Sequence, residues 1–152
     1  MDWSFWVSDL NVVTRTLRFI KAPRVGGRSG AVFVGSGAAS AAATLKAARS
    51  AMWKSRKTPP PLNWEPSDIL REMIVSGAER TVGGPIQVVK VYSHLSVMPY
   101  AVFWPSRATG RVTLFGRPLL DYEKTQRLAL DPETHKIYKL WDYLEVPTLK
   151  KR

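Results

Sequence analysis

One segment has the residue spacing of a phosphate-binding turn. The apolar run Ala31-Val-Phe-Val34 is typical of a strand, and Gly35-Ser-Gly37-Ala-Ala-Ser40 follows it. In a dinucleotide site, two such glycines give a tight turn and let the backbone approach a pyrophosphate closely. The third small position is Ser40 rather than Gly or Ala. No acidic residue that could bind a ribose lies about 20 positions after the motif, because the next acid along the chain is Glu65. Helix packing or anion contact at a helix N-terminus explains these glycines better, so the sequence predicts no cofactor.

Acid–base chemistry has few candidate residues. The close acidic pairs of the second half are Asp121 with Glu123 and Asp142 with Glu145, and the histidines are His94 and His135. We interpret the acidic pairs as surface or strand-end charges, because nothing beside them in the sequence indicates a shifted pKa. The histidines lack metal-ligand spacing, and the chain contains no cysteine. The sequence therefore predicts no catalytic residue, no metal site and no enzymatic activity.

Charge divides the chain unevenly. Residues 10–64 contain no Asp or Glu, and residues 1–64 carry ten basic and two acidic groups, or +8. Residues 65–152 carry 13 basic and 10 acidic groups, or +3. A segment with charges of one sign repels itself unless a polyanion or an anionic surface lies against it. Residues predicted to contact anionic lipid or RNA are Arg15, Arg18, Lys21, Arg24, Arg28, Lys46, Arg49, Lys54, Arg56 and Lys57.

A basic amphipathic helix is expected near the N-terminus. Ser8 or Asp9 could cap it, and Pro23 would stop it after Lys21. Apolar side chains recur on one helical face, at Leu10, Val13, Leu17 and Ile20. An aromatic lead-in before such a helix suits a membrane interface, while packing on the protein itself is the alternative.

An uncharged segment follows, from Gly30 to Leu45. Its length falls short of the roughly 20 residues of a spanning helix, but continuing to Trp53 would bring Lys46 and Arg49 to the interface. Two alternatives are equally open: a transmembrane helix over residues 30–53, locked against partner helices, or a soluble Ala-rich helix from Gly37 to Lys57.

The second half predicts a small α+β domain. Residues 1–57 form the basic helical region, residues 58–66 a Pro-rich linker and residues 67–152 the domain. The domain is expected to contain one short helix and an antiparallel sheet. The helix is expected over 68–76, ended by Gly77, and the strands over 86–92, 100–104, 111–115, 125–130 and 137–144. The last two strands would form a hairpin whose turn starts at Asp131-Pro132.

Residues 128–143, LALDPETHKIYKLWDY, are similar to the closing hairpin of NTF2-like domains. Such domains often end with a strand, a short acidic turn and a second strand that closes on Asp-Tyr. The resemblance covers under a fifth of the chain, and the region upstream is short for the family's cone of helices and bent strands. Family membership is therefore not assigned.

These features favour a non-catalytic accessory subunit of a large mitochondrial inner-membrane complex, of the respiratory-chain or ATP synthase type. An acid-poor N-terminal region with Arg and Ser is similar to an organelle transit peptide and suggests a mitochondrial or plastid setting, although Asp2 and Asp9 fall where transit peptides avoid acids. The expected location is the mitochondrial inner membrane or its matrix face. Expected partners are other protein subunits and a cardiolipin-like anionic phospholipid, with no small-molecule substrate. Expected interface anchors are Trp3, Trp6, Trp53, Trp104, Trp141 and Tyr143. The alternative is an organellar ribosomal protein whose acid-free region binds rRNA.

Overall fold

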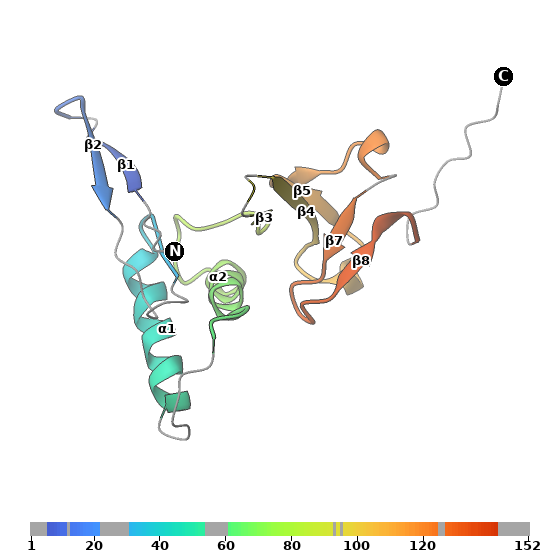
Figure 1. Cartoon of the computed structure of the whole chain (residues 1–152), viewed down its shortest axis with the longest axis horizontal. Coiled ribbons are helices and arrows are strands. Elements are labelled where there is room, and N and C mark those ends of the chain that lie inside the picture. The colour runs from blue at the N-terminus through green and yellow to red at the C-terminus, as the bar shows by residue number, and fades with distance from the viewer. Residues whose placement is uncertain are drawn as a thin grey trace. The chain divides into compact units, whose positions relative to one another are not determined.

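The computed structural model of the 152-residue chain describes residues 6–11, 13–21, 31–53, 61–92, 94, 96–124 and 127–142. The chain divides into two compact units (Figure 1). The N-terminal unit comprises Met1–Met73 and Gly77–Val82, and the C-terminal unit comprises Ile74–Ser76 and Gly83–Arg152. The predicted domain boundary at residues 58–66 stays a prediction, because residues 58–60 lie outside the described residues.

Two α-helices and eight strands form the regular structure of the described residues. In chain order they are β1 (Trp6–Asn11), β2 (Thr16–Lys21), α1 (Ala38–Trp53), α2 (Glu65–Ser76), β3 (Val88–Val91), β4 (Val97–Phe103), β5 (Val112–Leu114), β6 (Arg117–Pro118), β7 (Leu128–Leu130) and β8 (Ile137–Lys139). Three short 3-10 helices accompany them, η2 (Arg107–Thr109), η3 (Asp121–Glu123) and η4 (Leu140–Asp142).

The prediction of an N-terminal amphipathic helix is wrong. Its residues form an antiparallel hairpin of β1 and β2, in which Leu10 lies opposite Leu17. The apolar positions that suggested a helix overlap a second pattern, because Leu17 and Phe19 alternate with Thr16 and Arg18 at the period of a strand. β-Branched residues crowd the turn and its flanks, and these residues favour strands over helices. The period of two is therefore the pattern that the fold obeys.

The prediction of a membrane-spanning helix is also wrong. No helix in the part of the chain that the structure describes is both long enough and apolar enough to cross a bilayer. Helix α1 has 16 residues and so extends about 24 Å, less than the roughly 30 Å of a hydrocarbon core. Its buried residues Ala41 and Leu45 pack with Ile69 of α2. Of the two alternatives, the structure therefore matches the Ala-rich helix, over Ala38–Trp53, and residues 54–57 of that prediction lie outside the described residues.

Helix α2 begins within the predicted linker and ends where expected. The backbone N–H of Asn63 donates to the Glu65 carboxylate at 2.7 Å, and the N–H of Ser67 donates to the Trp64 carbonyl at 2.8 Å. These bonds start the helix three residues before the predicted first residue, Asp68. Gly77, with a φ of 65°, terminates it, because glycine adopts the left-handed conformation at little cost.

The sheet of the C-terminal unit is mixed, which corrects the predicted antiparallel sheet. Its order is β6-β5-β4-β7-β8, and β3 also pairs with β4. Strands β4 and β7 run parallel, with Ala101 opposite Ala129. The chain leaves β6 on one side of β4, passes through η3 and enters β7 on the other side. A connection of that kind joins parallel strands. Figure 1 labels β5, β4, β7 and β8 of this sheet.

Other sheet predictions are confirmed. Strands β4 and β5 pair antiparallel, and β7 and β8 form the expected hairpin. The predicted extent of the last strand, residues 137–144, is wrong: β8 ends at Lys139, because the chain then turns into η4 and buries Leu140 completely. Leu140 joins Ala101, Phe103 and Ala129 in the core of this unit.

Candidate functional site

Neighbouring cations pair with both carboxylates of the acidic pair Asp121 and Glu123 in η3. Lys124 donates a hydrogen bond to Asp121 at 2.6 Å, and Arg117 donates two to Glu123, at 2.9 and 2.8 Å. The hydrogen bond from Lys124 lowers the pKa of Asp121, and the bonds from Arg117 lower the pKa of Glu123 to about 2. A general acid needs a raised pKa, so this pair does not have that property. Of the other pair, Asp142 lies in η4 and Glu145 lies outside the described residues.

Both histidines take part in local packing. The ring of His94 stacks on Tyr92 with 5.6 Å between ring centroids. The backbone N–H of His135 donates to the Asp131 carbonyl at 2.9 Å, and His135 has a φ of 57° in that turn. Among the residues that the structure describes, no cluster of three His, Asp or Glu side chains could hold a metal ion.

Of the two glycines of the phosphate-like motif, Gly37 packs against protein and Gly35 is exposed. Residues 32–34 form no strand, and the chain turns at Gly35 with a φ of 102° before α1 begins. Gly37 is buried, and a Cβ at this position would lie 2.6 Å from Met73 Cε and 3.2 Å from Val82 Cγ2. The Ser36 hydroxyl bonds to that of Thr81. Side chains from residues 73–82 therefore crowd the start of α1, which accounts for the small residue at Gly37.

The predicted basic contacts fall into three groups. Arg15, Arg18 and Lys21 are exposed on the β1–β2 hairpin, and Lys46 is exposed on α1. Arg49, also on α1, is buried beside the helix core. The remaining predicted contacts, Arg24, Arg28, Lys54, Arg56 and Lys57, lie outside the described residues. The structure thus brings three of the ten cations together on one element.

The predicted aromatic anchors are dispersed. Trp104 follows β4 and is half-buried, whereas Trp141 in η4 is exposed and has Lys139 Nζ 5.7 Å from its ring centroid. Trp6 belongs to β1 and Trp53 to α1. Trp3 and Tyr143 lie outside the described residues.

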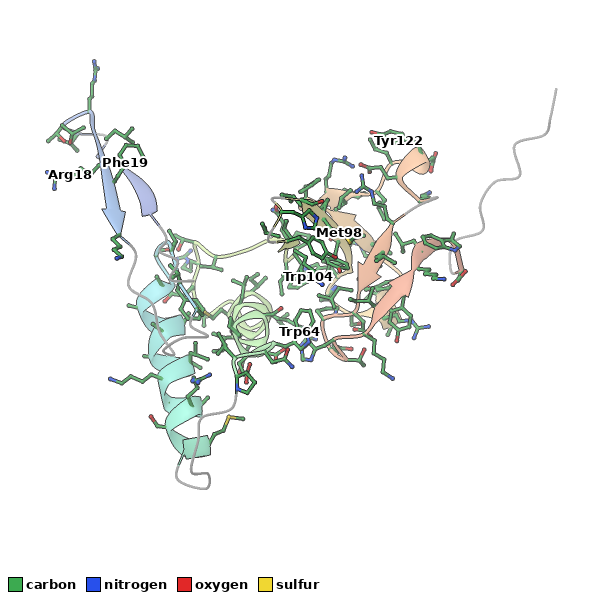
Figure 2. The ribbon with its side chains drawn as sticks, viewed as in Figure 1. Arg18, Phe19, Trp64, Met98, Trp104 and Tyr122 are labelled. Carbon is green, nitrogen blue, oxygen red and sulfur yellow. The ribbon has the colours of Figure 1, made fainter. Side chains whose placement is uncertain are left out.

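The β1–β2 hairpin exposes three large apolar side chains. Val13 is 94% exposed, Leu17 57% and Phe19 68%. Figure 2 shows the side chains of Arg18 and Phe19 extending from β2. We define the hairpin surface as Val13, Arg15, Leu17, Arg18, Phe19 and Lys21. It combines apolar and cationic side chains on a single two-stranded element.

Sequence reasoning identified the cations of this surface and missed Phe19. A helical interpretation places residue 19 away from the apolar face formed by Leu10, Val13 and Leu17. The alternation from Thr16 to Phe19 is the signal that could have found it.

The hairpin also lacks cover within the described chain. Strands β1 and β2 make extensive contacts with each other and with no other described helix or strand. The described side chains in the core around α1 come from residues 31–73. An isolated two-stranded hairpin is marginally stable at best in water.

A second group of contacts pairs cations with aromatic rings in the C-terminal unit. Lys90 Nζ lies 4.7 Å from the Tyr92 ring centroid, and Arg107 Cζ lies 4.3 Å from that of Tyr138. Arg107 also donates to the Tyr138 hydroxyl at 3.2 Å. Sequence analysis did not identify these pairs, because Arg107 and Tyr138 meet only when η2 and β8 fold together.

No family model, curated protein or solved structure matches this chain. The similarity to NTF2-like domains remains a resemblance of the β7–β8 segment alone. Functional argument therefore starts from the hairpin surface and from the roles of the titratable groups.

Proposed function

We propose that the chain is a non-catalytic accessory subunit of a large assembly, of the mitochondrial inner-membrane type, and that the hairpin surface is its docking element. The observation that carries this proposal is the exposure of Val13, Leu17 and Phe19 on a hairpin that no other described element covers. Exposed apolar groups clustered on one element mark interaction sites.

The charge layout supports the same proposal. Arg15, Arg18 and Lys21 add cations to the exposed apolar groups, and they lie in the window without carboxylates, residues 10–64. Binding to an anionic surface would relieve the mutual repulsion of these cations.

The roles of the titratable groups favour a structural protein. Glu123 and Asp121 are ion-paired to Arg117 and Lys124 respectively. The carboxylate of the buried Asp131 accepts hydrogen bonds from Glu133 N–H at 3.0 Å and from the Thr134 hydroxyl at 2.8 Å. These acids stabilise turns and loops, which leaves the docking role as the better supported one.

The test is native electrophoresis of membranes solubilised in mild detergent, with the tagged full-length chain expressed in its own cells. The wild-type chain should migrate in an assembly far larger than its own 17.1 kDa. Phe19→Glu should release it from the assembly, because a carboxylate replaces an apolar docking group. Val34→Glu is the matched control, since Val34 is exposed outside the hairpin. A wild-type chain that migrates as a monomer, or a Phe19→Glu chain that stays in the assembly, would contradict the proposal.

One observation favours a second candidate, an rRNA-binding subunit of an organellar ribosome. Lys90, Tyr92 and His94 form a stack of a cation and two rings, and bases can stack on such groups. Under this candidate the chain would co-sediment with ribosomal particles and be released by high salt. Tyr92→Ala would weaken that association, and Tyr122→Ala, which changes an exposed tyrosine elsewhere in the same unit, would leave it intact.

A further inference from the structure

The two faces of the hairpin differ in chemistry. The register places Leu17 opposite Leu10 and Phe19 opposite Ser8, whereas Arg18 lies opposite Asp9. Residues two apart on a strand share a face, so Leu17 and Phe19 lie on one face and Arg18 on the other. On the apolar face Leu17 and Phe19 are more than half exposed, and Lys21, two residues after Phe19, lies on the same face and is exposed as well. The hairpin is therefore amphipathic, with its apolar face open to the surroundings.

The turn of the hairpin extends this apolar face at its tip. Val13 is almost fully exposed there, while the polar groups beside it are satisfied locally, since the hydroxyls of Thr14 and Thr16 lie 2.7 Å apart. Arg15 follows with a φ of 53°, which closes the turn. Turns usually carry polar residues or glycine, so an exposed valine two residues before a cation is uncommon at this position.

The net charge of the hairpin is positive. Residues 6–21 contain Arg15, Arg18 and Lys21 against a single carboxylate, Asp9, which gives a net charge of +2. Cations beside exposed apolar groups match the boundary of an anionic bilayer, where phosphates lie directly above acyl chains.

We propose that the hairpin surface binds an anionic phospholipid bilayer directly, with Val13 and Phe19 entering the headgroup layer and Arg15 and Lys21 contacting lipid phosphates. This inference rests on the proposed function and names the partner of its docking element. RNA is a poorer occupant, because its phosphates offer nothing to Val13 and Leu17 and only Phe19 could stack on a base.

The absence of cysteine from the chain makes a site-specific test possible. Val13→Cys carries a single environment-sensitive nitrobenzoxadiazole label at the hairpin tip of the full-length chain. Ala108→Cys carries the same label at an exposed position in η2 as a control. Each protein is titrated with vesicles of phosphatidylcholine alone, vesicles of phosphatidylcholine with cardiolipin, and single-stranded RNA.

We expect the label at residue 13 to brighten and shift to the blue with cardiolipin vesicles, and neither phosphatidylcholine vesicles nor RNA to cause this shift. The label at residue 108 should respond to none of them. In vesicle sedimentation, Arg15→Gln and Lys21→Gln should each lower affinity about five-fold, because one interfacial cation is lost. Phe19→Ala should lower it about ten-fold through lost apolar burial, and Arg80→Gln, an exposed cation outside the hairpin, should leave it unchanged.

Three results would overturn the inference: no response at residue 13 to cardiolipin vesicles, a response to RNA alone, or equal vesicle binding by Phe19→Ala and wild type. Any of them combined with loss of the Phe19→Glu chain from the native assembly would leave the proposed function standing and make a protein or RNA surface the occupant of the hairpin. A wild-type chain that migrates as a monomer but still binds vesicles would instead contradict the proposed function alone.

Discussion

Arg117 binds Glu123 with both terminal nitrogens of its guanidinium. The two hydrogen bonds measure 2.9 and 2.8 Å, and the Leu120 N–H adds a third donor to the same carboxylate at 2.8 Å. Glu123 is buried, whereas the Arg117 side chain is 43% exposed. This arrangement ties β6 to η3 at the point where the chain crosses from one side of β4 to the other. A two-pronged pair fixes the position of the connection more strictly than a single contact would.

The Arg117–Glu123 pair predicts a pH dependence of stability. The hydrogen bonds from Arg117 lower the pKa of Glu123 from 4.5 to about 2, so the pair stabilises the fold fully above pH 4.5 and is lost as the pH falls toward 2. We expect Glu123→Gln to unfold at lower denaturant concentration than wild type at neutral pH. The difference should shrink steadily below pH 4.5, in urea titrations followed by circular dichroism. A difference that stayed constant down to pH 2 would contradict this role, and Lys136→Gln serves as an exposed control.

A larger residue in place of Gly37 should disturb packing at the start of α1. Its Cβ would meet Met73 Cε at 2.6 Å, and this end of a flexible side chain can move aside. Gly37→Ala should therefore destabilise the N-terminal unit by about 1 kcal/mol, the low end for overpacking, in urea denaturation. Gly83→Ala is the matched control, since a Cβ there meets nothing within 4 Å. Combining Gly37→Ala with Met73→Ala should cost less than the sum of the two changes, because the clash is relieved. Strict additivity would argue against this contact.

We expect the packing of Leu45 against α2 to stabilise α1. Leu45 is 0% exposed and lies in the core with Ala41 and Ile69, so Leu45→Ala should cost about 2–5 kcal/mol of unfolding free energy. Leu70 is partly exposed on α2, and Leu70→Ala should cost about 1 kcal/mol or less. Similar costs for the two changes, measured by denaturation of the full chain, would contradict the helix packing.

Replacing Asp131 should destabilise the β7–β8 hairpin. Its buried carboxylate accepts hydrogen bonds from Glu133 N–H and the Thr134 hydroxyl, and Asp131→Ala would leave these donors without their partner. The expected cost is about 1–3 kcal/mol in thermal or urea unfolding. Asp131→Asn retains one acceptor and should recover part of it. Equal stability of Asp131→Ala and wild type would show that the turn does not depend on this side chain.

Local patterns in the sequence predicted part of the fold. Gly77 marked the end of α2, and Asp131-Pro132 marked the turn between β7 and β8, because each depends on the preferences of one or two residues. Parallel pairing of Ala101 with Ala129 was not predictable in this way. It depends on where the chain passes after β6, which no local pattern encodes.

Two errors have a common physical origin. The apolar spacing of Leu10, Val13 and Leu17 fits a helix, yet the β-branched turn and the Leu17–Phe19 alternation favour a hairpin. Likewise, the uncharged run before Lys46 has the composition of a membrane segment. In the fold, Leu45 of this run is buried against Ile69 of α2. Composition specifies that a face must be covered, and tertiary packing decides what covers it.

The candidate site was predictable in composition and not in geometry. The excess of cations before residue 65 identified Arg15, Arg18 and Lys21 as contacts, whereas Arg49 turned out to be buried. Which cations remain on the surface depends on how α1 packs, and that information is absent from charge counts.

The most direct test of the docking role is hydrogen exchange in β2, measured on the free full-length chain and on the chain within its isolated assembly. Because the hairpin has no extensive cover in the described structure, amides of residues 16–21 should exchange rapidly in the free chain and slow by at least about ten-fold in the assembly. The amides of residues 100–103 in β4, which are buried, provide the internal reference. Equal exchange of β2 amides in the free chain and in the assembly would contradict the account.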